Sequence, residues 1–278
     1  MKKFVSLMLA LMMVFALCAC GSNAGNDKAA DAKLKILDAE YVTEDYAIAI
    51  AKENEDLLAK VDAALKELID DGTVAKVTAY YISGEGELPA FQQDVAADAE
   101  TLTMGTNATF PPYEFVENDK VVGIDATVAG LIADKLGMKL EIVDMEFDAI
   151  IPAVTSGKVD MGMAGMTVTD ERLKSVNFSS SYATGVQVII VPEGSNIASA
   201  DDIAAKIEAG EDIQIGCQNA TTGFIYASDT VENGGFGEDH VQAFPKGTDA
   251  IAALTSGKID CVIIDNEPAK AFVEANNG

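Results

Sequence analysis

The sequence predicts an α/β fold made of two similar lobes, and an internal repeat is the main reason. Residues 148–160 (DAIIPAVTSGKVD) return as residues 249–260 (DAIAALTSGKID). Each copy is typical of a short amphipathic helix that ends at a glycine and leads into an apolar strand. Strand-like runs precede both copies, at 140–145 and 241–244, and alternating strands and helices indicate parallel α/β units. Two widely separated copies are too few for a solenoid, so we expect one copy in each lobe.

Length and composition agree with this fold and exclude several function classes. With 278 residues, of which 49% are apolar, the chain can bury two substantial cores. Acidic residues (45) outnumber basic ones (19), and the net charge of −26 excludes a surface that follows nucleic-acid phosphates. The single histidine, His240, excludes metal sites built from several histidines. We therefore expect no nucleic-acid partner, no metal and no cofactor.

The N-terminus has the features of a secretory leader. Two lysines follow Met1, and the apolar run up to Cys20 is shorter than the roughly 20 residues of a membrane-spanning helix. Leu17-Cys18-Ala19-Cys20 resembles the lipobox of bacterial lipoproteins, which implies that residues 1–19 are removed and that lipid (palmitate) is attached to Cys20. Ordinary signal cleavage beside an incidental cysteine is the alternative. Residues 20–33 are small, polar and unpatterned, so we expect a flexible tether.

Further helices and a linker complete the order of elements. Residues 54–71 predict a helix with Asn54 as N-cap, and residues 126–136 predict another that Gly137 closes. Residues 83–100 are polar and show little periodicity, which indicates a linker.

Two cysteines remain beyond the leader, Cys217 and Cys261. Two cysteines do not make a disulfide framework. Both lie in strand-like runs, so we expect small buried apolar side chains. A bridge between them in an oxidising compartment stays open.

Three segments place polar groups at the carboxyl ends of strands, where an α/β fold binds its ligands. In the first, the strand-like run 161–166 leads into a predicted helix that Thr169 can cap. This cap would leave the backbone N–H groups of Gly165 and Thr167 facing a ligand. Arg172, one turn further on, offers a planar fork for a carboxylate. A solvated arginine at the start of a surface helix is the alternative.

The second segment provides further donors for an anion. Strand-like residues 213–218 lead through Thr221 and Thr222 into a helix predicted at 224–231. Hydroxyl and amide donors at a helix N-terminus favour an anion, although simple N-capping explains the two threonines as well.

The third segment provides an acceptor. Strand 259–264 ends at Asp265, whose carboxylate can accept from a cation or cap the helix that Pro268 starts. Donors from two lobes and one carboxylate match the α-carboxylate and α-ammonium of a free amino acid. Charged hydrogen bonds contribute about 1.5–3 kcal/mol each. Several of them, after ordering and desolvation costs, leave about −8 kcal/mol, which corresponds to micromolar affinity.

Motifs in a specific order resemble the family 3 extracellular solute-binding proteins, the polar amino-acid receptors of ABC importers. They are GTNATFPPYEF at 105–115, Gly123-Ile-Asp125, Phe147-Asp148, GMTVTDER at 165–172, FSSSY at 178–182 and TTG at 221–223. The resemblance covers essentially everything after residue 33. It implies a type II periplasmic-binding-protein fold, two α/β lobes around a central cleft.

The resemblance also implies a role for individual residues. Arg172 would pair with the ligand carboxylate, and Asp265 would take the α-ammonium. The other expected ligand-binding residues are Thr167 and the backbone around Ala164 and Gly165 at the carboxylate, Thr222 closing from the second lobe, Phe110 and Phe147 on the two faces of the ligand, and Gln218 and Asn107 at its side-chain end.

Two positions depart from the family pattern. Asn107 stands where the family often has an acidic residue, which favours a ligand with a neutral or polar side chain over lysine or arginine. Asn219-Ala220 stands where the family usually has a glycine before the threonine pair, and a clash there could alter loop closure.

The order of segments along the chain also differs from the family pattern, and the chain resembles a circular permutant. In the family, the segment similar to 34–81 comes last, after the helix that here ends at Gly278. The expected organisation is a signal peptide at 1–19, a lipid-anchored tether at 20–33, a second-lobe segment at 34–51, first-lobe helices at 52–82, a linker joining the ancestral ends at 83–100, the first lobe at 101–188 and the second lobe at 189–278. The chain would cross between lobes near Ala49–Ala51 and Val188–Val191.

The expected function is binding without catalysis. The resemblance implies a monomeric, lipid-anchored receptor on the outer face of the bacterial cytoplasmic membrane that delivers a free amino acid to an ABC permease and its ATPase. One alternative is a ligand sensor that docks on a membrane receptor. Another is a dehydratase-type enzyme on the same fold; its acid or base candidates near the cleft are Asp265 and Glu267, with His240 outside the motifs.

Overall fold

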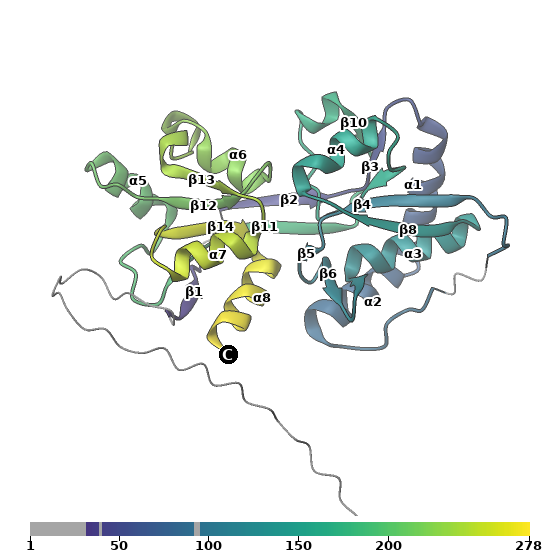
Figure 1. The fold of residues 1–278 in the computed structure, drawn as a ribbon, viewed down its shortest axis with the longest axis horizontal. Helices are drawn as coiled ribbons and strands as arrows, with labels where there is room; N and C mark the ends of the chain where they lie inside the picture. Colours follow the sequence, from purple (N-terminus) through teal and green to yellow (C-terminus); the bar gives the residue numbers. More distant parts are fainter. Residues whose placement is uncertain (1–31, 39–40, 92–94) are drawn as a thin grey trace, which may run out of the picture.

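The structure, a computed structural model, describes residues 32–38, 41–91 and 95–278. The expected signal peptide, the lipid attachment at Cys20 and most of the tether lie outside these residues. Figure 1 shows two lobes joined by a narrow waist. No helix in the described part of the chain is both long and apolar enough to cross a membrane.

The first lobe is built on a five-stranded sheet with four helices around it. The strand order is β10 (Val176–Phe178), β3 (Ala49–Ala51), β9 (Met161–Gly162), β4 (Thr101–Thr106) and β8 (Lys139–Asp144). Strand β4 is parallel to β8 and β9, whereas β3 is antiparallel to β9 and β10. The helices are α1 (Glu55–Asp70), α2 (Thr73–Thr78), α3 (Ile124–Leu136) and α4 (Phe147–Thr155), with a π-helical turn at Ala79–Ser83 and a 3-10 turn at Arg172–Lys174. A small antiparallel sheet of β5 (Thr109–Phe110), β6 (Glu114–Glu117) and β7 (Lys120–Val122) is added to this lobe.

The second lobe has a six-stranded mixed sheet. Its order is β1 (Leu34–Ile36), β11 (Ala183–Pro192), β14 (Cys261–Asp265), β12 (Ile215–Gln218) and β13 (Val241–Phe244), and β2 (Val42–Tyr46) also pairs with β11. Strand β12 is parallel to β13 and β14, while β1, β2 and β14 are antiparallel to β11. The helices are α5 (Ala200–Glu208), α6 (Thr222–Ser228), α7 (Gly247–Thr255) and α8 (Asn266–Asn277), with 3-10 turns at Val231–Asn233 and Glu238–His240.

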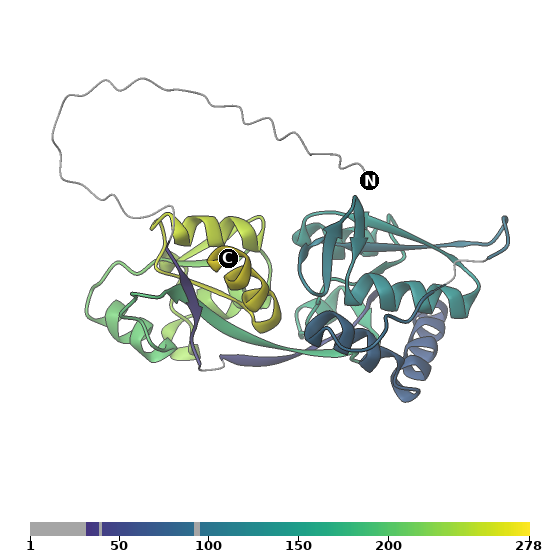
Figure 2. The same ribbon diagram turned by 90° about the horizontal axis from the view of Figure 1, so that it is seen from below.

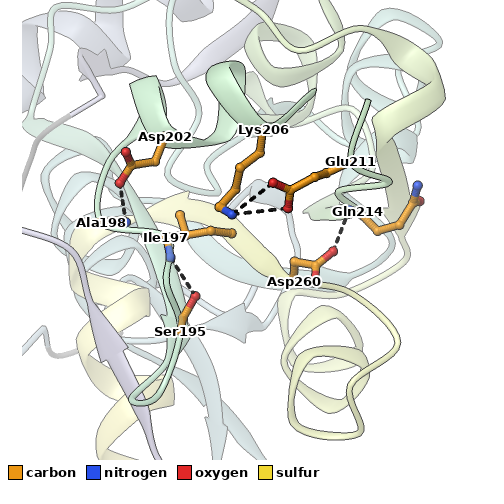
Figure 3. Close-up of polar contacts among 8 residues, drawn as sticks. All are labelled: Ser195, Ile197, Ala198, Asp202, Lys206, Glu211, Gln214 and Asp260. Carbon is orange, nitrogen blue, oxygen red and sulfur yellow. Dashed lines mark hydrogen bonds and ion pairs between the residues drawn. The ribbon is translucent and has the colours of Figure 1, made fainter. Parts of the chain in front are cut away.

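The two copies of the repeat lie in different lobes and have the same local structure. The first copy covers nearly all of α4 and leads directly into β9, and the second covers most of α7 and leads directly into β14. The final aspartate of each copy accepts the backbone N–H of the neighbouring parallel strand segment: Asp160 from Thr103 at 2.7 Å, and Asp260 from Gln214 at 2.8 Å. Figure 3 shows the second of these contacts, between Asp260 and Gln214. The repeat therefore encodes a helix, a turn and an aspartate that is hydrogen-bonded to the neighbouring strand segment.

Strands β2 and β11 form the waist between the lobes, as Figure 2 shows from below. They pair antiparallel from Tyr46 with Ala183 to Val42 with Gln187. The lobe crossings expected at Ala49–Ala51 and Val188–Val191 were placed too late in the chain. Ala49–Ala51 already pairs within the first-lobe sheet, and Val188 already pairs with Ile264 of the second. The crossings therefore run along β2 and along the start of β11.

Helix ends agree with the sequence in two cases and differ in two others. The side chain of Asn54 accepts from the N–H of Leu57 at the start of α1, and Gly137 closes α3 with φ of 65°. The helix expected after Thr169 is a single 3-10 turn, whose first N–H is bound by the Thr169 hydroxyl at 3.2 Å. The helix expected to reach Val231 ends at Ser228, because Asp229 has an extended backbone.

After Ser83, which ends the π-helical turn, the described residues of the expected linker form no helix or strand, but one of them is anchored. The ring of Phe91 lies directly over Gly130 of α3, where an added Cβ would come within 2.7 Å of the ring. The glycine thus provides the close approach that lets the linker pack on the first lobe.

The C-terminus lies against the start of the folded chain. Asn277 accepts from the N–H of Leu34 and donates to the carbonyl of Leu34, both at 2.9 Å. Figure 2 shows the C-terminus beside β1. Residues 34 and 277 are therefore neighbours in space.

Cys217 and Cys261 are free and buried in the second-lobe core. Burial raises the pKa of Cys217 to about 12. Both behave as the small apolar side chains expected from their strands.

Candidate functional site

A cavity lies between the two lobes. Both lobes supply its walls. The first provides Asn107, Phe110, Glu114, Phe147, Ala164, Gly165, Thr167 and Arg172, and the second provides Gln218, Thr221, Thr222 and Asp265. All ten residues expected to bind a ligand line this one cavity. The structure adds Glu114 and Thr221.

Arg172 is the positive group of the cavity, and it contacts both lobes. It starts the 3-10 turn after β9 and is only 8% exposed. One guanidinium nitrogen donates to the carbonyl of Thr167 at 2.8 Å, and the other donates to the carbonyl of Ala220 in the second lobe at 3.0 Å. The guanidinium also lies 5.3 Å from the centre of the Phe147 ring. Burial lowers the pKa of Arg172 from its ordinary value, and the planar group keeps further N–H donors for a carboxylate.

Asp265 is the negative group, held at the carboxyl end of β14. The hydroxyl of Tyr46, on the waist strand β2, donates to its carboxylate. Burial, followed by the nearby charge of Glu44, raises the pKa of Asp265 to about 7. An ammonium group placed beside it would offset both effects, because an opposite charge favours the ionised form.

Thr221 and Thr222 make different hydrogen bonds at the start of α6. Thr221 caps α6, since its hydroxyl accepts from the N–H of Phe224 at 3.3 Å and donates to the carbonyl of Gln218 at 2.8 Å. Thr222 is buried, and its hydroxyl accepts from the side chain of Gln187 at 3.4 Å. Thr221 therefore caps the helix as well as lining the cavity, and Thr222 lines the cavity beside it.

The end of the cavity that was expected to hold the ligand side chain contains two neutral amide side chains, which join the lobes. The amide of Gln218 donates to the side-chain oxygen of Asn107 at 2.9 Å. Asn107 in turn donates to the carbonyl of Met145 at 2.8 Å. Both side chains are buried, at 3% exposure each.

The expectation for the N–H of Gly165 was wrong. This group donates to the carboxylate of Asp125 at 2.9 Å, so it is not free for a ligand. Gly165 lies in the left-handed region with φ of 52°, and an added Cβ would come within 2.9 Å of Phe110. The residue gives the cavity space and a fixed backbone rather than a donor.

The turn that departs from the family pattern makes contacts with the first lobe. Ala220 adopts φ of 58°, a left-handed conformation that glycine enters more easily. Its carbonyl receives Arg172, and the preceding Asn219 donates to Asp148 of the first lobe at 2.8 Å. The turn is therefore compatible with a closed arrangement of the two lobes.

Several buried polar groups in and behind the cavity were given no role in the sequence analysis. They are Tyr46, Glu44 and Gln187 at the waist, and Glu114 and Asp125 beneath Phe110 and Gly165. Glu114 and Asp125 do belong to the quoted motifs, and their presence there was the available indication of a role. For Glu44 and Tyr46 the sequence carries no such indication.

Comparison with known proteins decides the family. The model for bacterial extracellular solute-binding proteins, family 3, matches residues 102–251. The chain belongs to this family. The arginine-binding extracellular protein ArtP of Bacillus subtilis (strain 168) is 32% identical over 63% of this family 3 chain, and the match spans 65% of that relative, just under two thirds.

Solved structures agree with this assignment. An ancestral arginine-binding protein bound to arginine is 40% identical, with a TM-score of 0.57, over 63% of this chain and 74% of that one. An ancestral arginine-binding protein bound to glutamine is 39% identical, with a TM-score of 0.56, over the same shares of the two chains. The family 3 fold is therefore shared with proteins whose solved forms hold amino acids.

The cavity offers no metal site. In the described residues, no group of three or more histidine, cysteine, aspartate or glutamate side chains is arranged to hold a metal ion.

Proposed function

We propose that this family 3 protein is a receptor that binds one free amino acid between its lobes and delivers it to an ABC permease and its ATPase. The observation that carries the proposal is that Arg172 and Asp265, from opposite lobes, line one cavity. A guanidinium fork suits the ligand carboxylate, and a buried carboxylate suits the α-ammonium. The ligand would hold the lobes together by these contacts, because only contacts made in the closed form favour closure.

The ligand side chain in this proposal is neutral or polar. Asn107 and Gln218 form its pocket, and neither carries a charge. An amide or hydroxyl can exchange hydrogen bonds with both, whereas a cationic group would find no carboxylate at Asn107 to neutralise it. The relative solved with glutamine supports this choice, and the relatives named for arginine make arginine the alternative to test.

A thermal-shift screen tests the function. Each of the twenty amino acids and cystine is added to the purified protein, because a ligand of the native state raises the unfolding midpoint by mass action. We expect a neutral or polar amino acid to give the largest shift. A largest shift with arginine or lysine would contradict the side-chain assignment, and no shift with any of them would contradict the receptor function.

Lipid anchoring is part of the same proposal. The lipobox-like sequence at 17–20 supports attachment of lipid at Cys20 on the outer face of the cytoplasmic membrane. We expect Cys20→Ala to release the protein into the soluble extracellular or periplasmic fraction and to remove labelling by radioactive palmitate. Continued labelling would contradict the assignment.

A circularly permuted chain is also proposed, with linker 83–100 joining the ancestral ends. The hydrogen bonds between Asn277 and Leu34 support this proposal, because they join the two segments that would be continuous in the ancestral chain, and permutation is tolerated when the ends to be joined are close. A rearranged chain running 101–278 and then 34–82 should fold and keep the dissociation constant within about threefold (0.6 kcal/mol). A rearranged chain without a cooperative melt would contradict the proposal.

A further inference from the structure

Asn219 and Asp148 form a hydrogen bond between the lobes that lies outside the ligand cavity. The side-chain amide of Asn219, in the second lobe, donates to the carboxylate of Asp148, in the first lobe, at 2.8 Å. Neither residue lines the ligand cavity. Both line a separate pocket between the lobes, and the side chain of Phe147 borders the two pockets. We call this contact the outer interlobe bond.

The backbone holds both ends of the outer interlobe bond in place. Asp148 lies in the first turn of α4, where the positive end of the helix dipole favours a carboxylate. Asn219 follows β12, and its backbone N–H donates to the carbonyl of Phe244 on β13 at 2.8 Å. Each end therefore belongs to a different lobe and to an ordered element of it, so movement of the lobes apart would break the bond.

Other hydrogen bonds that cross the cleft involve residues of the ligand cavity. Arg172 donates to the carbonyl of Ala220, and Gln218 donates to Asn107. A bound amino acid would compete for these groups, so the strength of both contacts depends on the ligand. The outer interlobe bond does not share this dependence, because its two partners do not line the ligand cavity. A contact made only in the closed form stabilises that form over every ligand.

We propose that Asn219 and Asp148 are positioning residues for closure, whose bond holds the lobes shut over any bound amino acid and slows its release without affecting ligand choice. The proposal rests on the amino-acid receptor function. The repeat provides an internal comparison. Asp249 occupies the position of Asp148 in the second copy, in the first turn of α7, and is exposed. In the described residues no side-chain hydrogen bond joins it to the other lobe.

Five variants test the bond itself. Asn219→Ala removes the donor, Asp148→Ala removes the acceptor, and a third variant combines the two changes. Asn219→Asp places a second carboxylate opposite Asp148, in a pocket that Glu146 also lines. The exchange of Asn219→Asp together with Asp148→Asn restores an amide and a carboxylate with their positions reversed. Asp249→Asn controls for the loss of an acid from the first turn of a helix.

Surface plasmon resonance on the full-length proteins measures association and dissociation rates for the two best-binding amino acids of the screen. Each alanine variant should release both ligands at least about fivefold faster, with association rates within about twofold of wild type. The combined alanine variant should release them no faster than the single variants, because all three lack the same bond. Asn219→Asp should release them faster than either alanine variant. The exchanged pair and Asp249→Asn should stay within about twofold of wild type.

Several results would overturn the proposal. They are unchanged release in the alanine variants, effects that multiply in the combined variant, an exchanged pair that releases ligand as fast as Asn219→Asp, and an altered preference between the two amino acids, which would indicate contact with the ligand. If an alanine variant does not melt cooperatively, the comparison of Asn219→Asp with the exchanged pair decides. A wild-type protein that binds no amino acid would instead refute the receptor function, and the closure role with it.

Discussion

Gln218 donates a hydrogen bond of 2.9 Å to Asn107 across the cleft, so two neutral side chains from different lobes close one end of the cavity. The bond places an amide oxygen where an acidic residue would place a charge. Side-chain selectivity should therefore depend on Asn107 more than on any other residue of the cavity.

Asn107→Asp should move selectivity toward cationic amino acids. The change keeps the shape and the acceptor for Gln218 but adds a buried negative charge, which attracts a guanidinium or ammonium. We expect the ratio of the dissociation constants for arginine and glutamine to fall at least about tenfold (1.4 kcal/mol). Calorimetry measures both constants. Asn118→Asp, at an exposed hairpin turn, controls for charge alone, and an unchanged ratio at position 107 would count against the assignment.

Arg172→Ala should abolish amino-acid binding and leave the fold intact. Two charged hydrogen bonds to a carboxylate, at about 1.5 kcal/mol or more each, correspond to a loss of at least about 100-fold in affinity. Titration calorimetry measures the loss, and circular dichroism checks the fold. Lys174→Ala, exposed on the same turn, should bind normally. Near-normal affinity of Arg172→Ala would refute the role in carboxylate binding.

Asp265→Asn should weaken binding at least about tenfold, or 1.4 kcal/mol, because the ammonium loses its counter-charge. The matched control is Asp249→Asn, an exposed position on α7. An unchanged dissociation constant in Asp265→Asn would remove the ammonium assignment.

The stability of the unliganded protein should depend on pH through the same carboxylate. Burial raises the pKa of Asp265 to about 7 and that of Asp125 to about 6, from an ordinary value of 3.8. A carboxyl whose folded-state pKa is raised binds its proton more tightly when folded, so its contribution to stability is complete below the ordinary pKa and is lost as the pH rises through 6–7. The free energy of unfolding should therefore fall between pH 5 and pH 8.

Urea unfolding at the two pH values measures this loss. Each pKa unit corresponds to about 1.4 kcal/mol, so the loss should reach a few kcal/mol. Asp265→Asn, which cannot titrate, should show a smaller loss. A variant with the same pH dependence as wild type would exclude Asp265 as a source.

Local signals explain how much of the fold the sequence could predict. The repeat, the Asn54 cap and the glycine after α3 each depend on residues a few positions apart, and the corresponding elements are present. The second and third cavity segments were placed correctly because parallel strands bring their carboxyl ends together.

Long-range contacts explain what the sequence could not show. Tyr46 and Asp265 are 219 positions apart and meet only when β2 reaches the waist. A single turn forms at Arg172 where a longer helix was expected, and its buried guanidinium is bound to the carbonyls of Thr167 and Ala220. Neither interaction produces a pattern along the chain.

Calorimetric titration with three forms of one ligand tests the central claim most directly. The free amino acid from the screen, its methyl ester and its N-acetyl derivative are compared on the full-length protein. The account predicts one site with micromolar affinity for the free amino acid. It also predicts a loss of at least about tenfold (1.4 kcal/mol) for each derivative, because one lacks the carboxylate for Arg172 and the other the ammonium for Asp265. Equal affinity for all three forms would contradict it.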